Sequence, residues 1–295
     1  MRLFFFVCVY AGVSGREEKK FNWKHDFVTL GLKTMECYRI DTIKYEEPMF
    51  PAHAVSATYV LTMENSTRDY RKNLDAARPT QTVHIQVNKG YRSCPKHNIC
   101  DQKSHYDLSD AVYRVFVDAR ERGYHNILVL EDDFFFRDRV SDADTASVSS
   151  FVATQHFDCY SLGCLPIVSV PSAYSPFHLR FYYFGGAHAM IFSPHAQKKY
   201  IRDYSNDACS VGHVDMYYSN TFRCHGYFKP LAYQLFEKTE NYENWLLAAK
   251  LMVKLAPTID RTPEPWFSIC YAISVAPFVA VLIAAVVWAL RQRKK

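Results

Sequence analysis

The sequence predicts an α/β protein in which a mixed, mostly parallel sheet is flanked by helices and is followed by one C-terminal transmembrane helix. Between residues 56 and 130, short apolar segments alternate with segments of helical period, an order typical of a sandwiched parallel sheet. Residues 267–290 form 24 consecutive positions without a charge, and as a helix they would be about 36 Å long against roughly 30 Å of hydrocarbon. The 295 residues are therefore enough for one sizeable domain and an anchor.

The first half of the domain is predicted to contain three strands and two helices. The strands are expected at 57–63 (ATYVLTM), 82–87 (TVHIQV) and 126–130 (NILVL), and the helices at 67–74 and 107–122. Each strand is a short run rich in apolar and β-branched residues. The second helix has one apolar stripe, made of Leu108, Val112, Val115, Phe116 and Ala119. Gly123 follows it as a stop signal.

The second half is less regular. We expect a helix at 143–155, a strand at 158–162, a Pro-rich loop at 165–177, an apolar stretch with a Gly pair at 182–192, and helices at 194–204, 211–221 and 240–255. Residues 16–54 have no clear period and are interpreted as an irregular N-terminal extension. The main domain is then expected at 55–244, with a membrane-proximal helix and linker at 245–266.

Both ends of the chain carry membrane-targeting signals. Residues 1–15 combine Arg2, an apolar stretch and small residues at Val13 and Gly15, which is typical of a cleaved signal peptide; an uncleaved short anchor is the alternative. The span at 267–290 is followed at once by the basic tail 291–295 (RQRKK), and positive residues stay cytoplasmic. The sequence therefore predicts a single-pass type I membrane protein whose domain faces the lumen of the endoplasmic reticulum or Golgi.

The net charge of +5 belongs to these two ends. Arg2 and four basic residues of the tail account for it, which leaves 30 basic and 30 acidic residues between them. The remaining chain has no basic patch or stripe, so nucleic acid is excluded as an expected partner.

Seven cysteines fall in the predicted lumenal part, namely Cys37, Cys94, Cys100, Cys159, Cys164, Cys209 and Cys224. Their spacings differ from those of zinc knuckles, so we expect local disulfides with one cysteine left over. Asn65 begins an Asn-Ser-Thr acceptor sequence for N-glycosylation.

Three adjacent carboxylates, Glu131, Asp132 and Asp133, directly follow the third predicted strand. Ligands of open α/β sheets bind beyond the carboxyl ends of strands, so these side chains project to where a site is expected. Adjacent carboxylates repel one another, and a divalent cation holds them ionised together; oxygen ligands favour magnesium or manganese over zinc. A solvated acidic turn is the alternative, but the three phenylalanines at 134–136 are poor composition for such a turn.

The segments around this cluster resemble glycosyltransferase family 25, the lipopolysaccharide and collagen galactosyltransferase group. The resemblance covers about residues 56–244 and lies in 59–71 (YVLTMENSTRDYR), 103–105 with the following helix, 127–133 (ILVLEDD), 157–163 (FDCYSLG), 186–196 (GAHAMIFSPHA), 213–218 and 230–234 (PLAYQ). It implies a GT-A type, Rossmann-like fold for the domain at 55–244. The extension and the insertion between Cys94 and Cys100 depart from the family pattern.

The resemblance also implies an activity: transfer of a hexose, galactose or glucose, from a UDP-sugar to a hydroxyl of a glycan, protein or lipid acceptor, with inversion. Asp133, with Glu131, would ligate Mn2+ or Mg2+, and Glu131 or Asp132 would touch the ribose. Arg71, or Arg68, would meet the uracil or a phosphate.

The base near the acceptor is expected at Asp215, with Asp158 in reserve. Gly186 would allow a close backbone approach, and His188 beside it would either pack or reach the metal or diphosphate.

Two other classes remain open at this level. One is a non-catalytic membrane glycoprotein that uses the scaffold as a binding module. The other is a metal-dependent hydrolase or phosphotransferase that acts on nucleotide-sugars, although the sequence has no P-loop and no His-rich metal motif.

Overall fold

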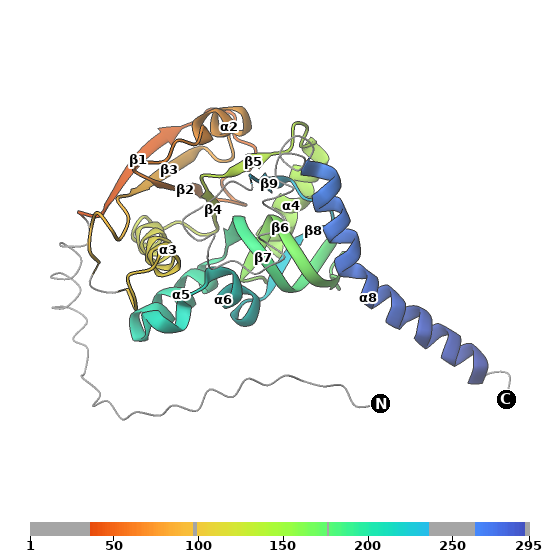
Figure 1. Cartoon of the computed structure of the whole chain (residues 1–295). Helices are drawn as coiled ribbons and strands as arrows, with labels where there is room; N and C mark the ends of the chain where they lie inside the picture. Colours follow the sequence, from red (N-terminus) through yellow and green to blue (C-terminus); the bar gives the residue numbers. More distant parts are fainter. Residues whose placement is uncertain (1–35, 97–98, 176, 236–262, 293–295) are drawn as a thin grey trace, which may run out of the picture.

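A seven-stranded mixed sheet lies at the centre of the computed structural model, which describes residues 36–96, 99–175, 177–235 and 263–292 (Figure 1). The strand order is β1-β3-β2-β4-β7-β6-β8. These strands are β1 (Tyr38–Lys44), β2 (Ala57–Met63), β3 (Thr82–Asn88), β4 (Ile127–Glu131), β6 (Cys159–Pro171), β7 (His178–Phe192) and β8 (Cys224–Tyr227). A separate pair is formed by β5 (Phe134–Phe136) and β9 (Ala232–Gln234).

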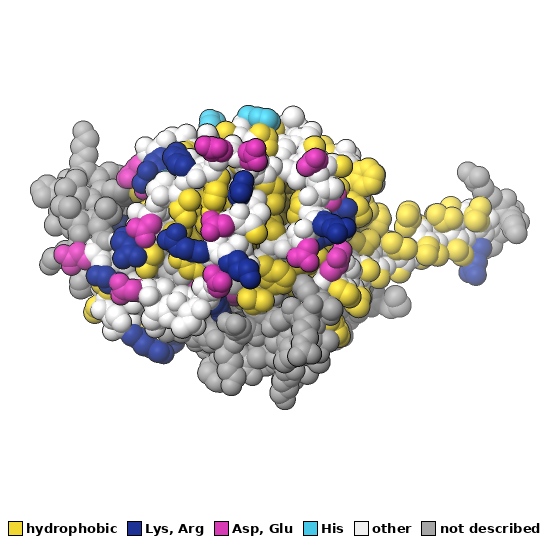
Figure 2. Space-filling model, turned by 90° about the horizontal axis from the view of Figure 1, so that it is seen from above, with side chains coloured by type: hydrophobic (Ala, Val, Ile, Leu, Met, Phe, Trp, Pro, Cys, Tyr) yellow, Lys and Arg dark blue, Asp and Glu magenta, His cyan; other side chains and the backbone are white. Residues whose placement is uncertain are grey.

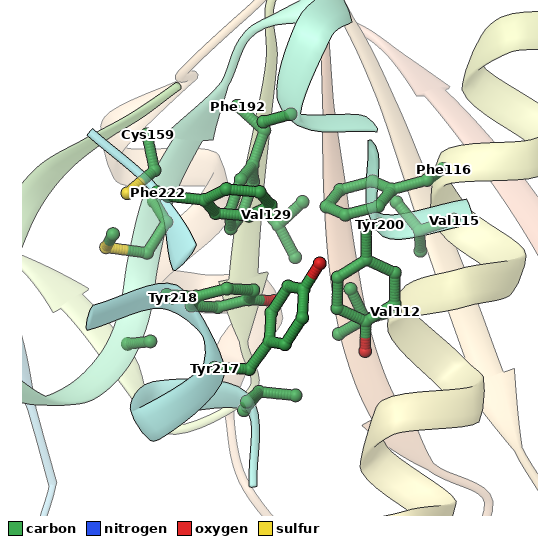
Figure 3. Packing of buried hydrophobic residues seen from close by; sticks show 14 of the residues in the cluster. Val112, Val115, Phe116, Val129, Cys159, Phe192, Tyr200, Tyr217, Tyr218 and Phe222 are labelled. Carbon is green, nitrogen blue, oxygen red and sulfur yellow. The ribbon is translucent and has the colours of Figure 1, made fainter. Parts of the chain in front are cut away.

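Helices cover both faces of the sheet. They are α2 (Tyr70–Ala77), α3 (Ser104–Glu121), α4 (Asp142–Thr154), α5 (Pro194–Asn206), η1 (Ala208–Val211), α6 (Val214–Thr221) and α8 (Pro263–Gln292). On one face, α3, α5 and α6 pack an aromatic core around Phe116, Tyr200 and Tyr218 (Figure 3). On the other face, Leu74 of α2 and Phe151 of α4 belong to a second core.

The middle of the sheet is parallel. β2 pairs in parallel with both β3 and β4, so that Tyr59 lies between His84 and Val129. Every residue of β3 is buried, as expected for strands covered on both faces. β7 then pairs antiparallel to β4, and β6 antiparallel to β7, which makes β6 run in the same direction as β4. The predicted α/β class, with a mixed sheet and a C-terminal apolar helix, is confirmed.

Two predicted segments differ from the structure. β1 lies inside the extension 16–54, which we interpreted as irregular; it pairs antiparallel with β3 at the sheet edge. β6 continues through 165–171, so the loop predicted at 165–177 is wrong for its first half. The strand continues past Pro166 because the pairing with β7 is irregular there. Proline has no backbone N–H to donate to the neighbouring strand, and a β-bulge tolerates the loss of that hydrogen bond. The helix predicted at 240–255 and the signal peptide at 1–15 lie outside the described residues.

Six cysteines form three disulfides: Cys37–Cys94, Cys100–Cys209 and Cys159–Cys224. The expected disulfides are confirmed, but the expected local pairing is wrong, since the partners are 57, 109 and 65 residues apart. The odd cysteine is Cys164, which is buried, and burial raises the pKa of its thiol to about 12. Its thiol is therefore a packed group and a poor nucleophile.

The C-terminal helix α8 has two parts. Its first turns pack on the domain, with Phe267, Tyr271 and Ser274 buried, and Glu264 near Arg137. From residue 276 onward every described side chain is exposed. Residues Glu264–Gln292 are long and apolar enough to cross a membrane.

Candidate active site

The three adjacent carboxylates lie at the carboxyl end of β4, as predicted. Glu131 is the last residue of the strand, and Asp132 and Asp133 form the turn into β5. Asp132 is 7% and Asp133 1% exposed, and the buried Phe134 holds the turn against the core, so the alternative of a solvated acidic turn is wrong. Figure 2 looks onto this edge of the molecule, where acidic and basic side chains surround exposed hydrophobic surface.

Asp132 is held by the connection between β2 and α2. The hydroxyls of Thr62 and Ser66 each donate to its Oδ2 at 2.7 Å, and Arg68 forms an ion pair with its Oδ1. Both oxygens of Asp132 are therefore engaged in fixing the loop that follows β2 beside the end of β4.

Asp133 is held less completely. The side-chain amide of Gln234 donates to its Oδ2 at 3.1 Å, and Arg68 lies 3.7 Å from the same oxygen. Its Oδ1 is buried without a hydrogen-bond partner among the described residues. Burial raises the pKa of Asp133 to about 6, although Arg68 and Gln234 act in the opposite direction. A buried carboxylate oxygen without a donor is costly, and a cation would satisfy it.

Asp215 is brought to the same place from a distant part of the sequence. It lies in the first turn of α6 and accepts hydrogen bonds from the backbone N–H groups of Gly186 (2.8 Å) and Ala187 (3.2 Å). Burial raises the pKa of Asp215, and the two N–H groups lower it. Burial, Asp133 and Asp215 together raise the pKa of Glu131 well above its ordinary range. The four carboxylates thus form one electrostatic cluster.

The close backbone approach expected at Gly186 is present. Its φ of +71° lies in the left-handed region, and a Cβ there would lie 3.1 Å from the amide oxygen of Gln234. A side chain at this position would therefore disturb both the backbone that binds Asp215 and the amide that binds Asp133.

His188 lies inside the domain next to Gly186. It is fully buried, and its ring packs edge-on to Phe267 of α8 with centroids 6.1 Å apart. Burial lowers the pKa of His188 to about 4, so the ring is neutral at physiological pH. These contacts are those of a packed residue between β7 and α8.

A stacked histidine pair adjoins the cluster. The rings of His105, in the first turn of α3, and His213, at the start of α6, are parallel to within 8° and 4.2 Å apart. Burial and His213 lower the pKa of His105, and His213 lowers that of Asp215. The pair therefore lies at the rim of the cluster, because His213 precedes Asp215 by two residues.

The structure brings Arg68, and not Arg71, to the carboxylates. α2 begins at Tyr70, so Arg68 remains in the turn at the end of β2, while Arg71 is on an exposed helical position. Arg71 is near enough to Tyr45 to affect its pKa, which places it on the outer side of α2.

Asp158 is not part of the cluster. It directly precedes Cys159, the first residue of β6. Cys159 pairs with Phe192 of β7, and Phe192 also pairs with Ile127, the first residue of β4. Because β6 and β4 run in the same direction, Asp158 lies at the opposite edge from Glu131. There it binds His195 and the backbone N–H of Arg223, both at 2.7 Å.

The chemistry of the cluster fits a divalent cation only in part. Within the described ranges no group of three or more His, Cys, Asp or Glu side chains is arranged to hold a metal ion. Asp133 offers a free, buried oxygen, and Glu131 adjoins it. Magnesium and manganese commonly use one or two carboxylates together with phosphates and water, so these two residues suffice if a diphosphate supplies the other ligands.

Four residues of the site carried no strong sequence signal: Thr62, Ser66, Gln234 and His213. Thr62 is part of an apolar strand, and Ser66 belongs to the glycosylation acceptor sequence and to the segment 59–71. Gln234 faces Asp133 because β9 pairs with β5 at Phe134. Thr62 reaches the site because β2 pairs with β4, a strand far away in the sequence.

Two surface depressions lie elsewhere. The two depressions, with volumes of about 670 and 480 Å³, lie beside α4, and both are lined by Met49, Asp142 and Thr145. Neither includes a carboxylate of the cluster, so they do not contribute to the site.

Comparisons with known proteins give only weak similarities. No protein-family model matches the chain, and no curated protein matches it. Among solved structures, a glycosyltransferase involved in the glycosylation of the major capsid of PBCV-1 is similar, with a TM-score of 0.37, 7% identity, and 68% of this chain and 99% of that chain covered. Protein A197 from STIV is similar with a TM-score of 0.33, 9% identity, and 62% and 86% covered. The chain thus has a weak structural similarity to a glycosyltransferase.

Proposed function

We propose that this chain is a membrane-anchored, metal-dependent glycosyltransferase that moves a hexose from a UDP-sugar to a hydroxyl of a glycan, protein or lipid acceptor. The site geometry supports this reading of the cluster, whereas membership of glycosyltransferase family 25 stays an expectation from the sequence, since no family model matches the chain.

The observation that carries this proposal is the unsatisfied, buried Oδ1 of Asp133 within four carboxylates. Among the described residues Arg68 forms ion pairs with Asp132 and Asp133, so one positive charge faces several carboxylates and their full ionisation would leave an excess of negative charge. A cation next to Asp133 and Glu131 removes that excess. Such an ion, when bound, supplies positive charge to a leaving diphosphate.

The other residues have complementary roles in the proposal. Arg68 is partly exposed and directed to the same edge, so its guanidinium can also pair with a phosphate oxygen. Asp132 fixes Arg68 and the loop after β2. Asp215 is the proposed base, since it is anchored by two backbone N–H groups while each of its oxygens keeps a second lone pair.

A lumenal location is part of the proposal. Three disulfides are typical of an oxidising compartment, and α8 is long enough to anchor the domain. We propose a type I orientation in the endoplasmic reticulum or Golgi, with Asn65, which is exposed, available for glycosylation.

A panel of UDP-sugars tests the activity. The full chain in detergent micelles is stripped of metal, supplied with Mn2+, and assayed for release of UDP and for transfer to added acceptors. We expect release that needs Mn2+ and is abolished in Asp133→Ala. Asp138→Ala is the matched control, because Asp138 is an exposed carboxylate five residues along the same segment. Turnover of Asp133→Ala at the wild-type rate would refute the metal assignment.

One observation favours the alternative of a non-catalytic binding module. Both oxygens of Asp132 and both of Asp215 already accept hydrogen bonds within the protein. A module of this kind would bind a UDP-sugar without releasing UDP from any donor, so the same panel, combined with a binding measurement, separates the two functions.

A further inference from the structure

Helix α8 packs against the β6 strand of the β6–β7 hairpin just before it leaves the domain. Ser274 of α8 lies 2.7 Å from Ser169 of β6, hydroxyl to hydroxyl, and Tyr271 contacts Cys164 of the same strand. Figure 1 shows α8 starting near β5 and β9 and passing β6 before it projects from the domain.

The part of α8 that is free of the domain is too short to span a bilayer. Residues 276–290 are 15 apolar positions beyond the last packed turn, which as a helix measure about 22 Å against roughly 30 Å of hydrocarbon. Tilting the helix would only shorten its reach across the membrane. About 8 Å, or roughly five residues, must therefore come from the segment that packs on β6.

The outer side of that segment is already suited to lipid. Ile269 and Ile273, on the side of α8 away from the domain, are 49% and 64% exposed. Covering them with hydrocarbon brings the bilayer surface up to the strands that α8 touches.

The hairpin that lies there has the composition of a membrane-interface element. Residues 163–186 contain a single charged side chain, Arg180, and no acidic one. Six large apolar side chains of this region are exposed: Ile167, Val168, Tyr174, Phe177, Tyr182 and the adjoining Phe228. Aromatic residues with an occasional basic one are typical of the boundary between headgroups and acyl chains.

Contacts within the hairpin and with the adjoining Phe228 keep these side chains together. Phe177 and Phe228 pack with ring centroids 5.6 Å apart, and the backbone N–H of Phe228 donates to the carbonyl of Phe177 at 2.9 Å. Arg180 lies 5.6 Å from the ring centroid of Tyr182. Figure 2 shows hydrophobic side chains at the base of the projecting helix, next to a group of basic and acidic ones.

We propose that the β6–β7 hairpin enters the lipid interface beside α8, so that the domain rests directly on the bilayer. The inference depends on α8 spanning a membrane and is independent of the proposed transferase activity. An element of this kind is immersed about 5–10 Å, which matches the length missing from the free part of α8.

Site-specific photo-crosslinking tests the proposal on the full chain in phosphatidylcholine liposomes that contain no other protein. A benzophenone amino acid replaces Ile167 or Phe177 in the hairpin, Val281 in the free part of α8 as the positive control, or Met216 on α6 as the negative control. Met216 is 49% and Val281 69% exposed, so all four positions accept a bulky probe without entering the core. Formation of the three disulfides, followed by mass spectrometry, verifies that each variant is folded.

We expect lipid adducts at one or both hairpin positions with a yield within about three-fold of that at Val281, and none above background at Met216. Hairpin yields equal to that at Met216 would overturn the proposal. Adducts between two copies of the chain at Ile167 and Phe177, without lipid adducts, would also overturn it, because the face would then be an interface between protein molecules.

Discussion

Replacing Asp133 by Asn is expected to stabilise the metal-free protein at neutral pH and to remove its response to divalent cations. Burial raises the pKa of Asp133 from its ordinary value of 3.8 to about 6. The unfolded chain therefore releases this proton near pH 4, while the folded protein keeps it until about pH 6. Folded wild-type protein binds more protons in this window, so its stability falls as pH rises through it. The change amounts to about 3 kcal/mol by pH 7, and a neutral Asn avoids it.

The assay is the free energy of unfolding of the full chain in detergent with EDTA, measured at pH 4 and pH 7. We expect Asp133→Asn to match the wild type at pH 4 and to exceed it by about 3 kcal/mol at pH 7. Excess Mn2+ at 100 times its dissociation constant should stabilise the wild type at pH 7 by about 3 kcal/mol and leave the variant unchanged.

Asp138→Asn provides the control, since it removes an exposed carboxylate from the same loop. Its stability difference from the wild type should be small at both pH values. A difference for Asp133→Asn that does not change with pH, or a variant that Mn2+ stabilises as strongly as the wild type, would refute the reasoning.

Three further predictions concern the site, the core and the cross-links. Arg68→Ala should weaken binding of UDP at least about ten-fold through loss of a charged contact, whereas Arg71→Ala should leave it unchanged; equal losses in titration calorimetry would contradict the assignment. Burial and Arg180 lower the pKa of His225 to about 4, so the unfolded state binds its proton first as pH falls below 6.5, and stability is lost down to pH 4. His225→Gln should reduce that acid loss by about 3 kcal/mol in urea unfolding, and an unaltered acid profile would count against it. Replacing Cys159 and Cys224 by Ala should cost about 2–5 kcal/mol in thermal unfolding, because the bridge joins β6 to β8 across 65 residues; an unchanged midpoint would show that the bridge contributes nothing.

The sequence was most informative where strands are buried on both faces. β2, β3 and β4 were predicted because such strands are nearly continuous apolar runs. β1 was missed because an edge strand with the sequence YRIDTIK keeps many polar residues exposed. The disulfide pairs could not be predicted, since they depend on which strands lie side by side and not on spacing along the chain.

In the candidate site, too, local sequence predicted some residues, while others depended on the tertiary structure. The carboxylates at the end of β4 could be located from the strand alone, because ligands collect at that edge of a parallel sheet. The choice between Arg68 and Arg71 depended on where α2 begins: the helix was predicted from residue 67 and begins at Tyr70, and local propensity does not fix a boundary that closely. Asp158, the reserve candidate for the base, precedes its strand, and a residue before a strand lies at the opposite edge of the sheet from a residue that follows a parallel strand.

Equilibrium binding of UDP to the full chain, with and without Mn2+, tests the central claim most directly, since the proposed site joins the nucleotide diphosphate to the carboxylates only through a cation. We predict that UDP binds the wild type and Asp138→Ala when Mn2+ is present, and that binding is lost after chelation or in Asp133→Ala. Binding of UDP with the same affinity in EDTA, or by Asp133→Ala as tightly as by the wild type, would contradict the account.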